Sequence, residues 1–217
     1  MTDYGLRRRI MVDSQVRTED VTKFPIIDAM LSVPRELFVP SARREAAYVG
    51  ENIPLAPGRV VLEPRTIAKM LDAIDIQPTE LVLDIGSGLG YSAALIARLA
   101  EAVVAVEDDA ARAREAEQSL SEAGIDNVAV VRCELAEGAP KHGPYDIITV
   151  QGAVEMMPDA ILEQLKEGGR IGCLFQEGRL QVCKIGYKVR GEVNWRRAFH
   201  AGAPVLPGFE AKRSFVL

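Results

Sequence analysis

The chain is poor in the residues from which disulfide-rich and metal-dependent folds are built. It has three cysteines and two histidines in 217 residues. The odd cysteine count, the lack of a CxxC pair and the lack of a recognisable secretory signal favour a reducing compartment, so we expect a cytoplasmic protein. His142 and His200 lie in separate segments. Neither a zinc site nor a Ser-His-Asp triad is therefore indicated, and we expect no metal.

The sequence also lacks long hydrophobic runs and an excess of positive charge. No apolar run reaches the ~18 residues that a membrane-spanning helix needs. The net charge of -5 gives the chain no global attraction to nucleic acid or anionic membranes. We interpret the one basic cluster, residues 7–9, as a solvated part of a helix rather than a nucleic-acid contact. We expect a monomer or weak dimer that binds neither nucleic acid nor membrane.

What the sequence does contain is an alternation of short apolar runs and helical segments. Residues 1–50 are predicted to be helical, and the proline-rich residues 51–64 to be loop or short extended segments. Beyond them, strands are predicted at residues 81–83, 103–106, 128–131, 146–150 and 171–175, with helices at 67–74, 91–100, 109–123 and 161–166. This pattern predicts an α/β fold with a doubly wound, mostly parallel Rossmann-like sheet. Residues 180–189 and 193–199 are predicted to form an antiparallel hairpin at its edge. The expected division is an N-terminal helical extension with a substrate-side loop, 1–64, and a core domain, 65–217.

The strongest local signal is a glycine-rich turn between the first strand of this core and the next helix. It reads DIGSGLGY over residues 84–91. Glycines allow a sharp turn and close approach to a ligand. The spacing is GxGxG and not the dinucleotide GxGxxG, since Tyr91 stands where the last glycine would be. An acid, Asp84, precedes the first glycine and would repel a pyrophosphate, whereas an amino acid or a sulfonium tolerates it. These features favour S-adenosylmethionine over NAD.

Several acidic and polar residues follow neighbouring strands and fit a nucleoside pocket. Glu107 ends the next strand, 23 residues after Asp84, where a carboxylate can accept both ribose hydroxyls. Glu134 is placed to accept from an adenine amino group, with a solvated loop acid as the alternative. Gln151 follows the fourth strand, with a simple tight turn as the alternative. The predicted cofactor-binding residues are Asp84, Ile85, Gly86, Ser87, Gly88, Gly90, Tyr91, Glu107, Asp108, Glu134, Leu135 and Gln151.

Segments spread over residues 11–209 resemble the protein-L-isoaspartate O-methyltransferase family. They are MVDSQVR at 11–17, VPRELFVP at 33–40, NIPL at 52–55, the glycine loop itself, and LEQLKEGGR at 162–170. The resemblance implies methyl transfer from S-adenosylmethionine to the free α-carboxyl of an isoaspartyl residue in a damaged protein or peptide, with S-adenosylhomocysteine as the product. The ester then collapses to a succinimide, which reopens in part to normal aspartate.

The chain departs from this family on the substrate side. The family carries a Gly-Gln-Thr-Ile-Ser-Gln-Pro-like segment, and residues 58–64 read GRVVLEP instead. Leu62 occupies the position of the family serine and Val60 that of the threonine, so no catalytic side chain is certain. Leucine cannot hydrogen-bond a substrate carboxylate. Arg59 or Arg65 is able to replace the lost hydroxyl as a carboxylate binder if it points at this place. The predicted substrate-side residues are Arg59, Val60 and Leu62.

Three readings follow from this departure. The chain is an isoaspartyl methyltransferase with an altered pocket, a family member that methylates another protein group or an unidentified small molecule, or a non-catalytic protein that keeps the cofactor-binding fold.

Overall fold

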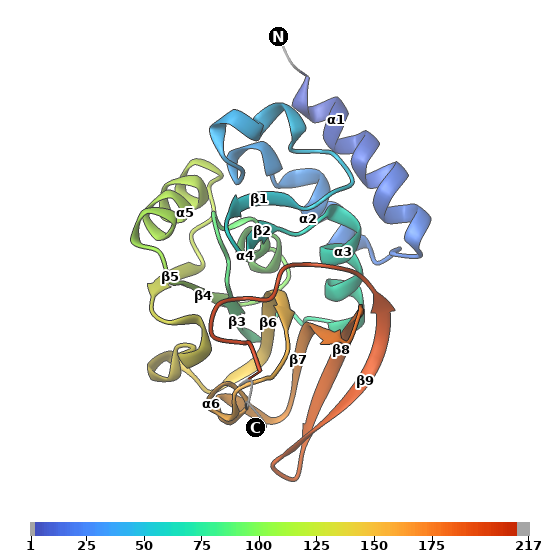
Figure 1. Ribbon diagram of the computed structural model, residues 1–217. Helices are drawn as coiled ribbons and strands as arrows, with labels where there is room; N and C mark the ends of the chain where they lie inside the picture. Colours follow the sequence, from blue (N-terminus) through green and yellow to red (C-terminus); the bar gives the residue numbers. More distant parts are fainter. Residues whose placement is uncertain (1–2, 212–217) are drawn as a thin grey trace, which may run out of the picture.

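The computed structural model describes residues 3–211 and has one large sheet at its centre (Figure 1). Seven strands form it in the order β5-β4-β3-β6-β7-β8-β9. Strands β3 to β7 pair in parallel, whereas β7-β8 and β8-β9 are antiparallel. The bounds are β3 Leu81–Ile85, β4 Ala102–Glu107, β5 Val128–Arg132, β6 Tyr145–Val154, β7 Leu165–Glu177, β8 Leu180–Val189 and β9 Glu192–His200. The predicted doubly wound sheet and its edge hairpin are confirmed.

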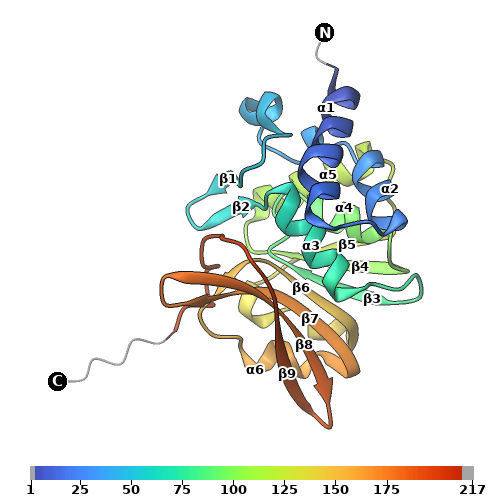
Figure 2. The ribbon, with the colours of Figure 1, turned by 90° about the vertical axis from the view of Figure 1, so that its right-hand side faces the viewer.

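Helices cover both faces of this sheet, as a parallel sheet requires. Figure 2 shows α3, α4 and α5 on one face and α6 on the other. These helices are α3 Pro64–Ile74, α4 Tyr91–Ala97, α5 Ala110–Glu122 and α6 Asp159–Glu163. Helix α6 ends before the predicted boundary, because Lys166, Gly168 and Gly169 belong to β7. The expected helix at residues 161–166 is therefore wrong in its second half.

The strand residues alternate between two hydrophobic clusters. Val82 and Val103 belong to the cluster under α3 and α4, whereas Leu83 and Val104 belong to the cluster that contains Ile161 of α6. This two-residue period follows from the pleat of a strand, and burial on both faces explains why the strands read as continuous apolar runs.

The N-terminal region is helical and packs above the sheet beside α3 (Figure 1). Its elements are α1 Tyr4–Met11, the π-helical η1 Val12–Val16, η2 Arg17–Glu19, α2 Phe24–Ser32, η3 Arg35–Leu37 and η4 Ser41–Ala46. Arg8 is not simply solvated, since it pairs with Glu36 and donates to Tyr48. One hydrophobic cluster joins residues of this region to the core, and the division at residue 64 stays a prediction.

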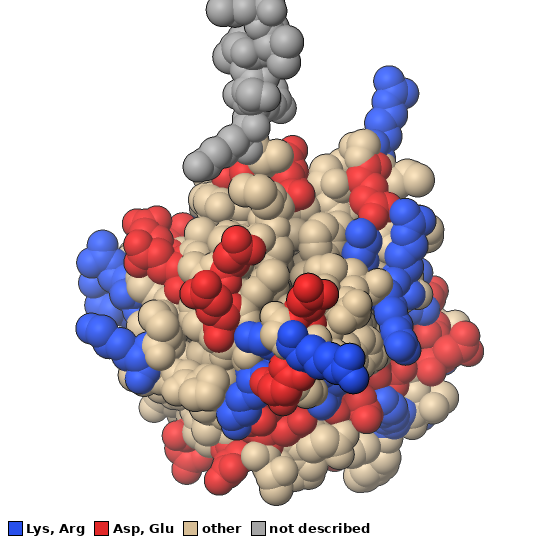
Figure 3. Space-filling view, turned by 90° about the horizontal axis from the view of Figure 1, so that it is seen from below, with Lys and Arg blue, Asp and Glu red and all other residues tan. Residues whose placement is uncertain are grey.

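Two further features complete the fold. Residues 53–61 form a short hairpin of β1 Ile53–Ala56 and β2 Arg59–Val61, and two 3-10 turns, η5 Leu135–Glu137 and η6 Pro140–His142, follow β5. Within residues 3–211 no helix combines the length and apolarity needed to cross a membrane. On the face seen from below, basic and acidic side chains are intermixed (Figure 3), so this face carries no extended field of one sign.

Candidate active site

The glycine loop lies at the carboxyl end of β3, between β4 and β6. Ligands of open α/β sheets bind where the strand order reverses, and β3 and β6 flank that point here. Gly86, Gly88 and Gly90 have φ values of 77°, 60° and 96°. An L-residue rarely adopts this left-handed region, so the turn depends on glycine at all three positions. The loop therefore has the geometry that its sequence predicts.

Asp84 lies beneath the loop and is fully buried. Its Oδ1 accepts from Thr149 Oγ1 at 2.8 Å and from Gln151 Nε2 at 2.6 Å, and its Oδ2 accepts from Ser92 Oγ at 2.5 Å. Burial raises the pKa of Asp84 to about 6, although these three donors oppose the rise. Asp84 and Gln151 thus bind each other, while their predicted contact with the cofactor stays a prediction.

A cluster of ion pairs lies at the carboxyl end of β4. Arg59 Nη2 lies 2.5 Å from Glu107 Oε2, and Arg59 Nη1 lies 3.1 Å from Glu107 Oε1 and 2.5 Å from Asp108 Oδ1. Arg112 of α5 donates from Nε to Glu107 Oε1 at 2.8 Å and from Nη2 to Asp108 Oδ1 at 2.9 Å. The Arg59 and Glu107 side chains are 2% and 0% exposed. Two guanidinium groups and two carboxylates therefore balance one another, with Arg59 and Glu107 shielded from water and Arg112 and Asp108 partly exposed.

The pKa values of the two carboxyl groups in the cluster are shifted in opposite directions. Burial raises the pKa of Glu107, and the guanidinium groups of Arg59 and Arg112 oppose that rise. Burial acts in the same direction on Asp108, but the guanidinium groups of Arg59 and Arg112 lower its pKa to about 2.

In the folded protein, every hydrogen-bond acceptor site of the Glu107 carboxylate is already occupied. Besides the two bonds from Arg59 and one from Arg112, it accepts from the backbone N–H of Gly88 at 2.9 Å and of Asp109 at 3.2 Å. A carboxylate offers about four lone-pair sites, so these bonds saturate it. Two ribose hydroxyls would find no free oxygen there.

The glycine loop is also covered by side chains of the same chain. A Cβ built on Gly88 would lie 2.5 Å from Leu55 Cδ1, and one built on Gly86 would lie 3.3 Å from Leu206 Cδ1 and 3.6 Å from Arg59 Nη2. The loop therefore has the backbone geometry for S-adenosylmethionine, and in this arrangement side chains of Leu55, Leu206 and Arg59 occupy the space over its glycines.

The substrate side is apolar and closed. Leu62 is 2% exposed and belongs to the main hydrophobic cluster. Its carbonyl accepts from Arg35 Nη2 at 2.9 Å. Arg59 is turned to Glu107, and Arg65 pairs with Glu19 at 2.8 Å. Neither arginine is therefore directed at Leu62 as a carboxylate binder.

Arg35 is a buried residue that the sequence did not single out. It is fully buried, donates from Nε to the carbonyl of Ala47 at 2.7 Å, and lies over the ring of Tyr91, 4.5 Å from its centroid. Within residues 3–211, Arg35 Nη1 and Tyr91 OH have no hydrogen-bond partner. Tyr91 also packs on Phe38 with ring centroids 6.1 Å apart. These contacts assign Tyr91 to the core.

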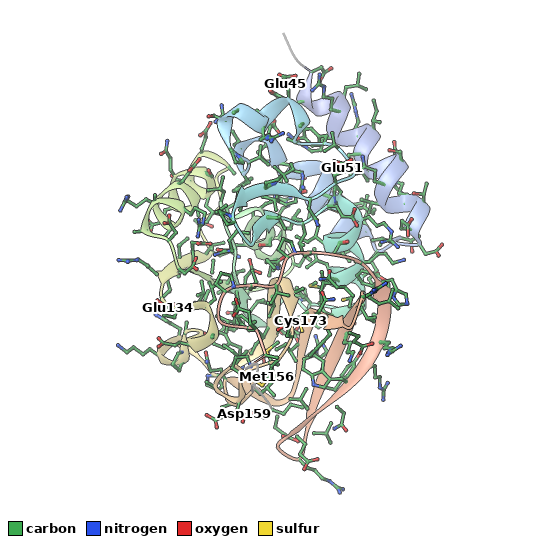
Figure 4. All side chains as sticks on the ribbon, in the orientation of Figure 1. Glu45, Glu51, Glu134, Met156, Asp159 and Cys173 are labelled. Carbon is green, nitrogen blue, oxygen red and sulfur yellow. The ribbon has the colours of Figure 1, made fainter. Side chains whose placement is uncertain are left out.

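The other predicted residues lie at different depths. Ile85, Ser87 and Leu135 are buried, and Val60 is half-buried on β2. Glu134 is exposed and lies at the rim of the molecule (Figure 4), although it follows the strand beside Glu107. Arg112, Leu55 and Leu206 were not predicted. Arg112 follows Asp108 by four residues, a spacing that favours an ion pair, but nothing in the local sequence places Leu55 or Leu206 at the glycine loop.

The comparisons agree with one another over nearly the whole chain. A sequence profile described as protein-L-isoaspartate(D-aspartate) O-methyltransferase matches residues 7–200. A protein-L-isoaspartate O-methyltransferase of Koribacter versatilis is 34% identical over 193 residues, which are 89% of this chain and 87% of that protein. A protein-L-isoaspartate O-methyltransferase 2 of Pelobacter propionicus is 36% identical over 201 residues, 93% and 89% of the two chains.

A solved structure shows the same fold. It is a putative protein-L-isoaspartate O-methyltransferase of Plasmodium falciparum in complex with S-adenosyl-L-homocysteine, and its TM-score is 0.79. A further solved protein-L-isoaspartate O-methyltransferase has a TM-score of 0.78. The Plasmodium match covers 95% of this chain and 99% of that one at 18% identity, so it bears on the fold alone. From the profile and the two bacterial relatives, the chain belongs to the protein-L-isoaspartate(D-aspartate) O-methyltransferase family of S-adenosylmethionine-dependent methyltransferases.

Proposed function

We propose that this protein transfers a methyl group from S-adenosylmethionine to the free α-carboxyl of isoaspartyl residues in damaged proteins. The observation that carries the proposal is the glycine loop, with three left-handed glycines at the carboxyl end of β3 and Glu107 at the end of β4. The relatives named for this reaction cover most of the chain. S-adenosylmethionine supplies an electrophilic methyl group, and a carboxylate is already a nucleophile at neutral pH, so alignment matters more than acid–base help.

A second candidate is methylation of a different acceptor, either another protein group or a small molecule. It is favoured by Leu62, which is buried and apolar at the position of the family serine. A buried leucine leaves a substrate carboxylate without a hydrogen-bond donor there, and Arg59 and Arg65 do not supply one.

An isoaspartyl peptide separates the two candidates. Labelled S-adenosylmethionine is incubated with the protein and either this peptide or the matching aspartyl peptide, and base-labile label is counted. We expect label on the isoaspartyl peptide only. Protein that binds S-adenosylhomocysteine but labels neither peptide would rule out the repair reaction and leave the second candidate.

Leu62→Ser tests the substrate side directly. We expect it to raise the rate on the isoaspartyl peptide at least about 10-fold, because a hydroxyl donor to the carboxylate contributes roughly 1.5 kcal/mol or more. Leu62→Ala is the matched control, since it opens the same space without a hydroxyl. Equal rates for the two variants would show that space, and not hydrogen bonding, limits the reaction.

A further inference from the structure

The cofactor site of this protein is filled by its own side chains, and the manner of filling is specific. Arg59 comes from β2, 48 residues away from Glu107 in the chain, and reaches both carboxylates at the end of β4. Its two nitrogens meet the two oxygens of Glu107, as two ribose hydroxyls would. Bidentate contact between a guanidinium and a carboxylate is the strong form of this interaction. Arg59 therefore takes the place of the ribose at Glu107, the carboxylate expected to accept from the ribose hydroxyls.

The segment after β9 covers the rest of the site. We call residues 201–209 the C-terminal strap. The backbone N–H of Leu206 donates to the carbonyl of Ala153 at 2.9 Å, and Ala153 donates in turn to the carbonyl of Pro204 at 2.9 Å. These bonds hold the strap against the end of β6. Leu206 is 1% exposed as a result.

Leu206 lies on the glycine surface that a cofactor would use. A Cβ on Gly152 would lie 2.6 Å from Leu206 Cγ, and a Cβ on Gly86 would lie 3.3 Å from Leu206 Cδ1. Close approach to glycine backbone is the reason for glycine in a ligand loop. Here that close approach is made by a leucine of the same chain.

We propose that Arg59 and Leu206 close the cofactor site from within and compete with S-adenosylmethionine for it. Arg59 occupies the ribose acceptor, and Leu206 occupies the surface of Gly86 and Gly152. A cofactor binds only when both side chains leave, so the protein binds it less tightly than its glycine loop alone would allow. This inference rests on the proposed function, because it takes the ligand of the site to be S-adenosylmethionine.

Titration calorimetry with S-adenosylhomocysteine tests the proposal. The proteins compared are the wild type, Arg59→Gln, Leu206→Ala and the double variant, each checked for native near-ultraviolet circular dichroism. Arg112→Gln is the matched control. Arg112 binds the same two carboxylates, but none of its atoms is among those nearest to a Cβ built on Gly86.

We expect Arg59→Gln and Leu206→Ala each to bind S-adenosylhomocysteine at least 10-fold more tightly than the wild type, and the double variant to bind it most tightly. Arg112→Gln should bind no more tightly than the wild type. If one single variant does not fold, the other still decides the matter, because each removes a separate part of the closure.

Two results would overturn the proposal. One is a wild type that binds as tightly as both single variants. The other is a folded double variant that does not bind at all, since the closure would then not be what keeps the cofactor out. Failure of the proposed function looks different: the double variant binds S-adenosylhomocysteine tightly but transfers no methyl group from S-adenosylmethionine to the isoaspartyl peptide.

Discussion

Replacement of Glu107 by glutamine is expected to lower the free energy of unfolding by about 3 kcal/mol. The cluster of Arg59, Arg112, Glu107 and Asp108 is neutral as a whole, and the substitution leaves it with one excess positive charge. Arg59 would carry that charge at 2% exposure, with only Asp108 as an ionised partner. An uncompensated buried charge is costly because water no longer solvates it.

A double-mutant cycle in urea at pH 7 separates this effect from a general loss of packing. Arg59→Gln together with Glu107→Gln leaves Arg112 and Asp108 as a balanced pair, so the double variant should recover about 2 kcal/mol relative to the sum of the single variants. Asp108→Asn is the control, and its loss should be smaller because Asp108 is 24% exposed. Additive losses from Arg59→Gln and Glu107→Gln would show that the pair is not coupled.

Asp84→Asn is expected to stabilise the protein by about 2–3 kcal/mol at pH 8. The pKa of Asp84 is raised to about 6 in the folded protein, above its ordinary value of 3.8, so the folded state holds the proton more tightly than the unfolded state does. The stability from this group is therefore present below about pH 4 and is lost as the pH rises through about 6. Asparagine stays neutral and avoids that loss. Its oxygen can accept from Thr149 and Gln151, and its amide can donate to Ser92 Oγ.

Urea midpoints of wild type and Asp84→Asn at pH 5, 6.5 and 8 measure this difference. The difference should grow from pH 5 to pH 6.5 and change little from pH 6.5 to pH 8, since it levels off above the folded pKa. Asp84→Ala is the control, because it leaves the three buried donors without an acceptor and should destabilise the protein at all three values. An asparagine variant less stable than the wild type at pH 8 would show that the hydrogen bonds to the carboxylate outweigh its burial.

Local sequence was a good guide to the elements and to the turn that carries the site. The strands around β3 and β4 were predictable, because apolar runs bounded by helices read as buried parallel strands. Gly86, Gly88 and Gly90 were predictable as a sharp turn, because they require left-handed backbone. The end of α6 was not, since Leu165 already pairs with Tyr145 of β6 and begins β7, and the register shifts across Gly168 and Gly169 before Arg170 pairs with Ile147.

What occupies the site was decided by tertiary structure. The sequence by itself determined the fold class, which follows from the alternation of apolar runs and helices along the chain. It also determined the glycine loop and the place of Glu107, since each depends on neighbours at the end of one strand. It did not determine that Arg59 meets Glu107 or that Leu206 covers Gly152, because these partners are brought together only by the β1-β2 hairpin and the C-terminal strap. A contact between distant segments depends on their packing, and neither periodicity nor spacing encodes it.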